Sequence, residues 1–208
     1  MTEFLLLSFE ITGTLAFAAS GAILGLEKHM DILGISILGL TTAVGGGVIR
    51  DLILGITPPM TFRNPIYATI AIATSVLIFI IARKYPLFKG HLYELIMLIM
   101  DSLGLGVFTV IGINTAYSLN NDYSTFLLIF VGVVTGVGGG VIRDMMAGVA
   151  PYIFVKHFYA SASIIGAFAC VVIWPYAGSV PSMFTGTAII IMLRLCAAKF
   201  RWNLPKAH

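Results

Sequence analysis

The sequence predicts an all-α integral membrane protein, and three observations lead to this fold class. Hydrophobic residues make up 59% of the 208 residues and charged residues only 10%, whereas soluble domains carry about 25% charged residues. The mean hydropathy is +1.01. The apolar residues also form long unbroken stretches, unlike the short alternating strands of a membrane barrel. A helix needs about 20 such residues to cross a hydrocarbon core of about 30 Å.

Seven stretches meet this length, and connectors rich in charged residues, proline or asparagine separate them. The charged run Glu27–His29 follows the first span, Pro58-Pro59 follows the second, and Arg83-Lys84 follows the third. The fourth span is followed by Asn120–Asp122, and the sixth by the segment from Pro175 to Pro181. The expected spans are Phe4–Leu26, Ile32–Gly55, Pro65–Ala82, Leu92–Ile113, Tyr123–Val149, Phe154–Trp174 and Val180–Ala198.

Basic residues near the ends of the spans predict how the chain is oriented in the cell membrane, because lysine and arginine accumulate on the cytoplasmic side. One side carries only Arg63, and the other carries eight basic residues. We therefore expect the N-terminus outside and the tail Arg201–His208 in the cytoplasm. The eight residues are Lys28, Arg83, Lys84, Lys89, Lys156, Lys199, Arg201 and Lys206.

The chain contains an internal repeat. The heptapeptide Gly-Gly-Gly-Val-Ile-Arg-Asp occupies residues 45–51 and recurs at residues 138–144, a shift of 93 positions. Flanking residues match at nearly the same shift, for example Glu10 with Asp101. Each copy holds three spans, and this odd number places the second copy upside down in the membrane. The two copies are then related by a pseudo-two-fold axis in the membrane plane, an architecture found in many transporters and some channels.

This repeat divides the chain into three parts. Residues 1–90 are expected to form the first three-helix repeat, and residues 91–178 the second, inverted one. Residues 179–208 then form a seventh helix outside the repeat, followed by the cytoplasmic tail.

The glycine triplets predict a kink or a break in the second and fifth spans, because each glycine disfavours helix by about 1 kcal/mol relative to alanine. Half-helices ending near Val44 and Val137 would leave carbonyls for a cation, and freed backbone groups must face protein or water. The alternative is close helix packing, since small residues spaced by four allow helices to touch. The candidate residues are Gly45, Gly46, Gly47, Gly138, Gly139, Gly140, Thr42 and Thr135.

Ionisable residues within the spans are costly in lipid and are therefore candidates for function. Glu10 lies about 9 Å inside its span and Arg50 about 7.5 Å from the same face, at 1.5 Å per helical residue. We therefore expect Glu10 beside Arg50 and, by the same argument, Asp101 beside Arg143. Arg194 is expected to extend toward the interface. The intramembrane charges of the two clusters are Glu10, Arg50, Asp51, Asp101, Arg143 and Asp144.

Each cluster contains two acids and one arginine, a balance that favours cations along a shared path. The alternative is a structural ion pair that locks helices together. Asp51 and Asp144 are expected to offset the positive end of the half-helix that follows each triplet. Tyr67 and Tyr159 are candidates for lining the path, although packing or interfacial roles are as common for tyrosine.

Catalytic motifs are missing from the sequence: there is no Gly-x-Ser-x-Gly, no His-Glu-x-x-His and no paired nucleophile and base. We therefore expect no enzyme and no cofactor. No metal-ligand spacing occurs either, so the only metal expected is a transient monovalent cation. A net charge of +3 gives no indication of a nucleic-acid partner.

The doubled heptapeptide, placed in the second helix of each triplet and followed by a seventh helix, resembles the prokaryotic trimeric intracellular cation (TRIC) channel family. Some classifications call the same repeat a glycine transporter domain. The resemblance covers the whole chain. It implies a homotrimer in membrane lipid, with one pore per subunit lined by the kinked second and fifth helices. It also implies permeation by K⁺, Na⁺ and similar cations. Charged motifs near the kinks link animal members to lipid and calcium control, and they are absent here.

Two functions remain open from the sequence. The first is a passive channel for monovalent cations, and the second is a secondary transporter for a small solute such as glycine. The repeat architecture is compatible with both. Saturable flux coupled to an ion gradient would indicate the transporter, and unitary currents would indicate the channel.

Overall fold

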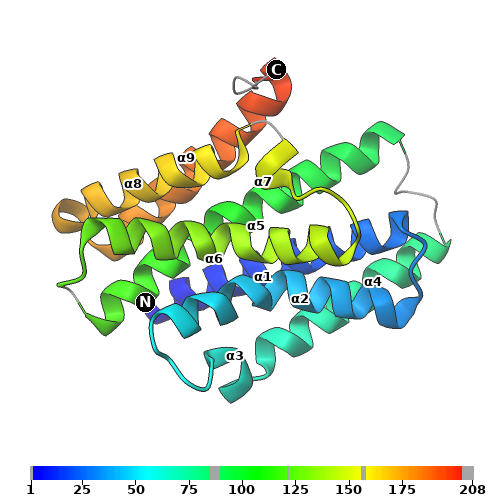
Figure 1. Cartoon of the computed structure of the whole chain (residues 1–208), viewed down its shortest axis with the longest axis horizontal. Coiled ribbons are helices and arrows are strands. Elements are labelled where there is room, and N and C mark those ends of the chain that lie inside the picture. Colours follow the sequence, from blue (N-terminus) through cyan, green and yellow to red (C-terminus); the bar gives the residue numbers. More distant parts are fainter. Residues whose placement is uncertain (1, 85–89, 121, 156–157, 203–208) are drawn as a thin grey trace.

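The computed structural model describes residues 2–84, 90–120, 122–155 and 158–202, and this part of the chain is built from helices (Figure 1). Seven of them are long and apolar enough to cross a membrane, which confirms the predicted fold class. The long helices are α1 (Thr2–Glu27), α2 (Ile32–Ile53), α4 (Ile66–Lys84), α5 (Gly90–Leu119), α6 (Thr125–Met146), α8 (Tyr159–Ala177) and α9 (Ser179–Phe200). Two short helices are α3 (Met60–Arg63) and α7 (Tyr152–Val155).

The two helices that carry the glycine triplets begin and end in the same way. Asp31 caps α2 by accepting a hydrogen bond from the Gly34 amide at 2.7 Å, and Ser124 precedes α6 in the same role. Such a side chain satisfies an amide that the first turn leaves without a helical partner. Glycines with positive φ, Gly55 at 73° and Gly148 at 67°, follow the two helices. Because glycine adopts this conformation without steric cost, the chain turns there into α3 and α7.

The sixth predicted span begins too early, and the fourth ends too early, since α5 continues to Leu119. The sequence predicts the sixth span from Phe154 to Trp174, but α8 begins only at Tyr159. The short helix α7 uses Tyr152–Val155, and Phe158 has a left-handed backbone with φ 51°. The apolar residues of α7 lengthen the hydrophobic stretch in the sequence, and the predicted span therefore begins before α8.

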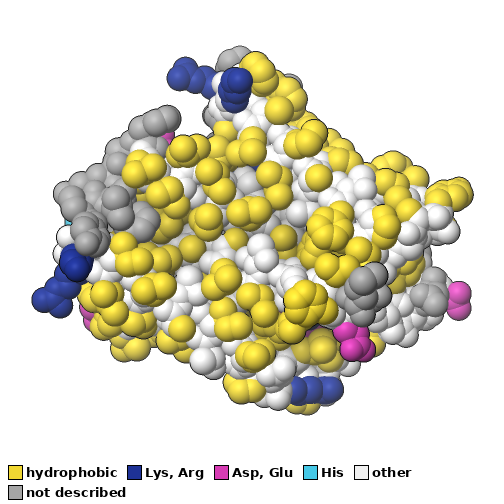
Figure 2. All heavy atoms as spheres, turned by 180° about the vertical axis from the view of Figure 1, so that it is seen from behind, with side chains coloured by type: hydrophobic (Ala, Val, Ile, Leu, Met, Phe, Trp, Pro, Cys, Tyr) yellow, Lys and Arg dark blue, Asp and Glu magenta, His cyan; other side chains and the backbone are white. Residues whose placement is uncertain are grey.

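Helices α2 and α6 run side by side through the middle of the molecule (Figure 1). Helix α1 packs against both α2 and α5, and α9 packs against α5 and α8. Small and apolar residues of α1, among them Phe17 and Ala18, are almost fully buried at this centre. Hydrophobic side chains cover most of the face in Figure 2, and charged side chains lie at its margins. This distribution is the one that a multi-pass protein surrounded by lipid requires.

The orientation in the membrane is a testable prediction. Lys89, Lys156 and Lys206, which contribute to the argument from basic residues, lie outside the described residues. Lys28 and Asp122 are exposed at connectors predicted on opposite sides. In a background without native cysteines, a cysteine in place of Asp122 should react with an impermeant thiol reagent added outside. A cysteine in place of Lys28 should react only from the cytoplasm, and the reverse pattern would overturn the predicted orientation.

Candidate functional site

The glycine triplets form the contact between α2 and α6. A Cβ atom on Gly46 would lie 2.1 Å from the Thr135 carbonyl oxygen, and one on Gly139 would lie 2.1 Å from that of Thr42. The two helix backbones therefore touch at a point where no side chain fits. The small-residue packing considered from the sequence is present at this crossing.

The predicted helix break is wrong. Both α2 and α6 are helical without interruption through their triplets, so no half-helix ends near Val44 or Val137. Close packing of the two backbones offsets the low helix propensity of glycine, because tertiary contacts commonly outweigh local propensity. A kink of either axis without a break stays a prediction.

The remaining triplet glycines differ in how much space surrounds them. A Cβ on Gly45 would contact Ile142 at 2.6 Å, and one on Gly138 would contact Gly46 at 3.2 Å. A Cβ on Gly140 would meet the Tyr159 hydroxyl at 2.8 Å. Gly47 alone among the six has only a distant neighbour, the Arg50 Nη2 atom at 3.9 Å.

The two threonines contact helices rather than each other. The Thr42 hydroxyl donates to the Leu38 carbonyl, and the Thr135 hydroxyl donates to the Val131 carbonyl at 2.6 Å. A Cβ on Gly21 would approach the Thr42 hydroxyl to 2.6 Å, so this oxygen packs against α1. Thr135 packs in the same way against Gly112 of α5. Their role as cation ligands stays a prediction.

We call the charged residues of the first repeat the outer cluster: Glu10, Arg50, Asp51 and Tyr67. Arg50 binds Asp51, with Nε 2.8 Å and Nη2 2.7 Å from Oδ1. Glu10 accepts a hydrogen bond from the Tyr67 hydroxyl. Within the described residues no ion pair joins Glu10 to Arg50, although the two line the same cavity, so they are neighbours without being paired. Arg50 pairs with Asp51 instead, and Glu10 is bound by Tyr67 of α4.

The inner cluster belongs to the second repeat and consists of Asp101, Arg143, Asp144, Tyr159 and, as shown below, Arg194. Arg143 Nη1 lies 2.7 Å from Asp101 Oδ1, and Nη2 lies 2.8 Å from Asp144 Oδ1. The predicted pairing of Asp101 with Arg143 is therefore confirmed. Arg143 Nη1 also donates to the Ser20 hydroxyl at 2.9 Å, and the arginine is fully buried.

Arg194 lies inside the protein, which contradicts the expectation that it extends to the interface. Arg194 is only 4% exposed, and its Nη2 atom lies 3.4 Å from Asp101 Oδ2. The guanidinium carbon stands 4.7 Å from the centre of the Tyr159 ring, within the range of a cation–π contact. The inner cluster thus contains two acids and two arginines and is neutral, instead of carrying the expected charge of −1.

Asp51 and Asp144 connect the long helices to the short ones. Asp51 Oδ2 accepts a hydrogen bond from the Met60 amide, and Asp144 Oδ2 accepts one from the Tyr152 amide, both at 2.8 Å. These amides begin α3 and α7, so each aspartate caps the short helix after its own. The prediction that these aspartates offset the positive end of a new half-helix is wrong, because both lie in the last turns of continuous helices.

Two cavities border α1. The outer cavity, of about 210 Å³, is lined by Glu10, Thr14, Gly47, Arg50 and Tyr67, among others. The inner cavity, of about 520 Å³, is lined by Leu24, Glu27, Tyr93, Glu94, Arg194 and Arg201, among others.

A packed layer lies between the two cavities. Thr14 at the first cavity and Leu24 at the second are about 15 Å apart along α1, at 1.5 Å per residue. Phe17 and Ser20 lie between them and are at most 1% exposed. Arg143, which contacts Ser20, belongs to the same buried layer. The tyrosine hydroxyls of Tyr67 and Tyr93 each donate to a glutamate of α1, one in either cavity.

Comparison with known proteins gives relatives along the whole chain. A family model described as glycine transporter matches residues 7–83 and 98–175, which correspond to the two copies of the repeat. The UPF0126 inner membrane protein YadS of Escherichia coli (strain K12) is 36% identical over 94% of this chain and 93% of its own length. The UPF0126 membrane protein YvgT of Bacillus subtilis is 32% identical over 94% of this chain and 93% of its own.

Solved structures of similar chains agree with the fold described above. A chain from work on conductance through TRIC cation channels is 36% identical, with a TM-score of 0.83, and the alignment covers 96% of either chain. The TRIC trimeric intracellular cation channel orthologue from Rhodobacter sphaeroides is 30% identical, with a TM-score of 0.86 over 95% of this chain and 98% of its own. The doubled motif, the seven helices and these relatives together establish that the chain belongs to the TRIC family, whose family model is described as glycine transporter.

Proposed function

We propose that this protein is a passive channel for monovalent cations, permeable to K⁺, with one path through each subunit of a homotrimer in the bacterial inner membrane. The observation that carries the proposal is a carboxylate–tyrosine pair in each of the two cavities. Glu10 with Tyr67 lies in the outer cavity, and Glu27 with Tyr93 lies in the inner one. Carboxylates at both ends of a path attract cations and repel anions.

Among the described residues, four arginines border the cavities, Arg50 and Arg63 in the outer one and Arg194 and Arg201 in the inner one, and two of them are engaged by aspartates. Arg50 contacts Asp51 at 2.7 Å, and Arg194 contacts Asp101 at 3.4 Å, so both guanidinium groups have carboxylates of their own. Glu10 and Glu27 then supply oxygen atoms to an ion that enters either cavity, and oxygen atoms suit hard cations such as K⁺.

The path between the cavities follows α2 and α6 in this proposal. Val44 and Gly47 of α2 line the outer cavity, and Arg143 of α6 lies in the buried layer. Conduction requires this layer to open, because Phe17 and Ser20 fill the space between the cavities in the present conformation. Relatives described as TRIC cation channels, one of them a trimeric channel orthologue, support a cation channel and the homotrimer.

A secondary transporter for a small solute such as glycine is the second candidate. Two cavities at opposite ends of a closed layer also suit alternating access, in which one side opens at a time. The description of the family model favours this candidate.

The proposal is tested in vesicles that contain the purified protein. Wild-type protein should release K⁺ down its gradient and exclude chloride, and chemical crosslinking in mild detergent should stop at a trimer. Glu10→Gln should lower the K⁺ flux by about tenfold, which corresponds to about 1.4 kcal/mol. Tyr67→Phe is the matched control, because it keeps the carboxylate and removes only its hydrogen-bond donor. We expect this control to retain most of the flux.

The same vesicles distinguish the two candidates. Saturable glycine uptake without any K⁺ flux would refute the channel and support the transporter. Equal K⁺ flux through wild type and Glu10→Gln would show that this carboxylate does not border the path.

A further inference from the structure

The acid and the tyrosine of the two charged clusters differ in exposure, and α9, the helix outside the repeat, contributes to this difference. In the first repeat, Glu10 and Tyr67 border the open outer cavity and are partly exposed. Their equivalents in the second repeat, Asp101 and Tyr159, are 0% and 2% exposed. Arg194 of α9 contacts both of them, and the first repeat has no equivalent of this side chain among its described residues.

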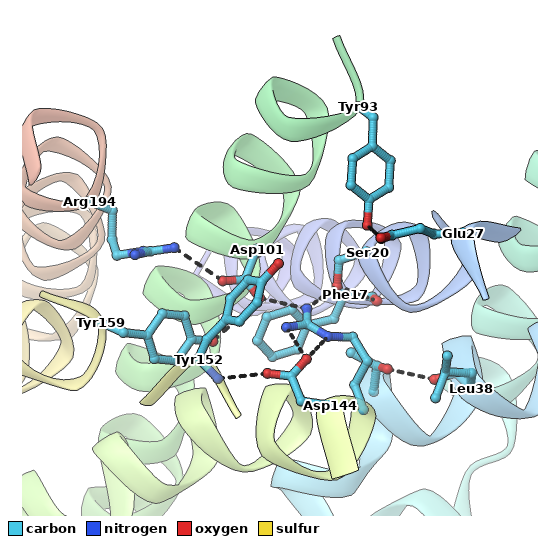
Figure 3. Close-up of polar contacts among 12 residues, drawn as sticks. Phe17, Ser20, Glu27, Leu38, Tyr93, Asp101, Asp144, Tyr152, Tyr159 and Arg194 are labelled. Carbon is cyan, nitrogen blue, oxygen red and sulfur yellow. Dashed lines mark hydrogen bonds and ion pairs between the residues drawn. The ribbon is translucent and has the colours of Figure 1, made fainter. Parts of the chain in front are cut away.

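Both oxygens of the Asp101 carboxylate contact a guanidinium group, and Arg194 provides the second contact. Arg143 Nη1 is 2.7 Å from Oδ1, and Arg194 Nη2 is 3.4 Å from Oδ2. Each oxygen therefore faces a guanidinium group, and neither is available to a cation. Figure 3 shows Arg194 reaching Asp101 from the helix opposite, with the Tyr159 ring beside it.

Arg194 also lies at the border between the buried layer and the inner cavity. It lines that cavity together with Glu27 and Glu94, while its guanidinium group contacts Asp101 inside the layer. The cavity, at about 520 Å³, is much larger than an arginine side chain needs. A rotation of the side chain toward Glu27 and Glu94 would keep the guanidinium beside carboxylates and would expose Asp101 Oδ2 to the cavity.

We infer that Arg194 closes the inner end of the cation path by covering Asp101, and that the path opens when this side chain moves into the inner cavity. The inference rests on the proposed cation path. It assigns a function to a helix that the repeat does not explain, and it makes the inner end of the path differ from the outer end. With Arg194 in place the inner cluster is neutral and sealed; without it, the cluster is negative and borders the cavity.

The first measurement is K⁺ flux in vesicles. Arg194→Gln should raise the K⁺ flux by about tenfold. This change corresponds to an energy barrier for conduction that is lower by about 1.4 kcal/mol. Arg194→Lys keeps the charge but lacks the planar group that stacks on Tyr159, so its flux should fall between wild type and Arg194→Gln. Lys199→Gln is the matched control, because Lys199 is a basic residue of the same helix, is exposed and is not among the residues that line either cavity. It should leave the flux near that of wild type.

The second measurement does not depend on ion flux. Cys170 and Cys196 are replaced by alanine, and a cysteine is placed at Ser20, which is buried against Arg143. A cationic thiol reagent on the cytoplasmic side should leave this cysteine unmodified when Arg194 is present. It should modify the cysteine when Arg194→Gln is added. Elution of each variant as the same oligomer as wild type shows that the fold is retained, and Arg194→Lys serves if Arg194→Gln does not fold.

The outcomes separate the inference from the proposed function. If wild type passes K⁺ but Arg194→Gln matches Lys199→Gln and the Ser20 cysteine stays unmodified, the inference is overturned and the channel stands. If no variant passes K⁺ but Arg194→Gln makes the Ser20 cysteine reactive, the channel is refuted, while the closing role of Arg194 is supported.

Discussion

Replacement of Arg143 by methionine should lower the free energy of unfolding in detergent by about 3–5 kcal/mol, the usual loss when one partner of a buried ion pair is removed. Arg143 is fully buried and binds both Asp101 and Asp144 at 2.7 and 2.8 Å. Methionine fills most of the same volume but leaves the two carboxylates without this cation. Arg194 still contacts Asp101 at 3.4 Å, so Asp144 loses the most.

The internal repeat supplies the control for this experiment. Arg50 is the equivalent arginine of the first repeat, and it is 8% exposed beside the outer cavity. It forms an ion pair only with Asp51 among the described residues, and water in the cavity can solvate the carboxylate after mutation. Arg50→Met should therefore cost less than half as much as Arg143→Met in thermal or denaturant unfolding. Equal losses would mean that burial does not determine the strength of the two clusters.

Alanine at Gly46 or Gly139 should destabilise the protein by about 1–3 kcal/mol, the usual cost of overpacking. Each new Cβ would lie 2.1 Å from a backbone carbonyl oxygen of the facing helix, so α2 and α6 must move apart. The effect opposes local propensity, because alanine favours helix over glycine by about 1 kcal/mol. The measurement is the unfolding midpoint of each variant in detergent, together with its K⁺ flux in vesicles.

Gly47→Ala is the matched control within the same triplet. Its new Cβ has only the Arg50 Nη2 atom at 3.9 Å, so the substitution meets no obstacle. We expect it to be neutral or to stabilise the protein by up to about 1 kcal/mol. A destabilised Gly47→Ala alongside a tolerated Gly46→Ala would contradict the helix crossing described above.

Part of the inner cluster could be predicted from the sequence, because depth in the membrane follows from counting residues along a helix. Asp101 and Arg143 lie at similar depths in neighbouring spans, and the structure pairs them at 2.7 Å. The same count placed Glu10 and Arg50 at one depth, and both line the outer cavity. Depth does not give the direction in which a side chain points around the helix axis. The ion pair between Asp51 and Arg50 therefore could not be predicted from the depths of the residues in the membrane.

The sequence by itself determined the seven helices, the internal repeat and the positions of the charges. Long apolar runs must satisfy their own backbone hydrogen bonds in lipid, and helices do so locally. Only the tertiary structure decided that the glycine triplets form a crossing of continuous helices and that Arg194 turns inward to Asp101. The physical reason is that these helices are apolar on most sides, so no polar face indicates which side meets a neighbour. Those contacts depend on how the helices rotate and pack, which the residue pattern along one helix does not encode.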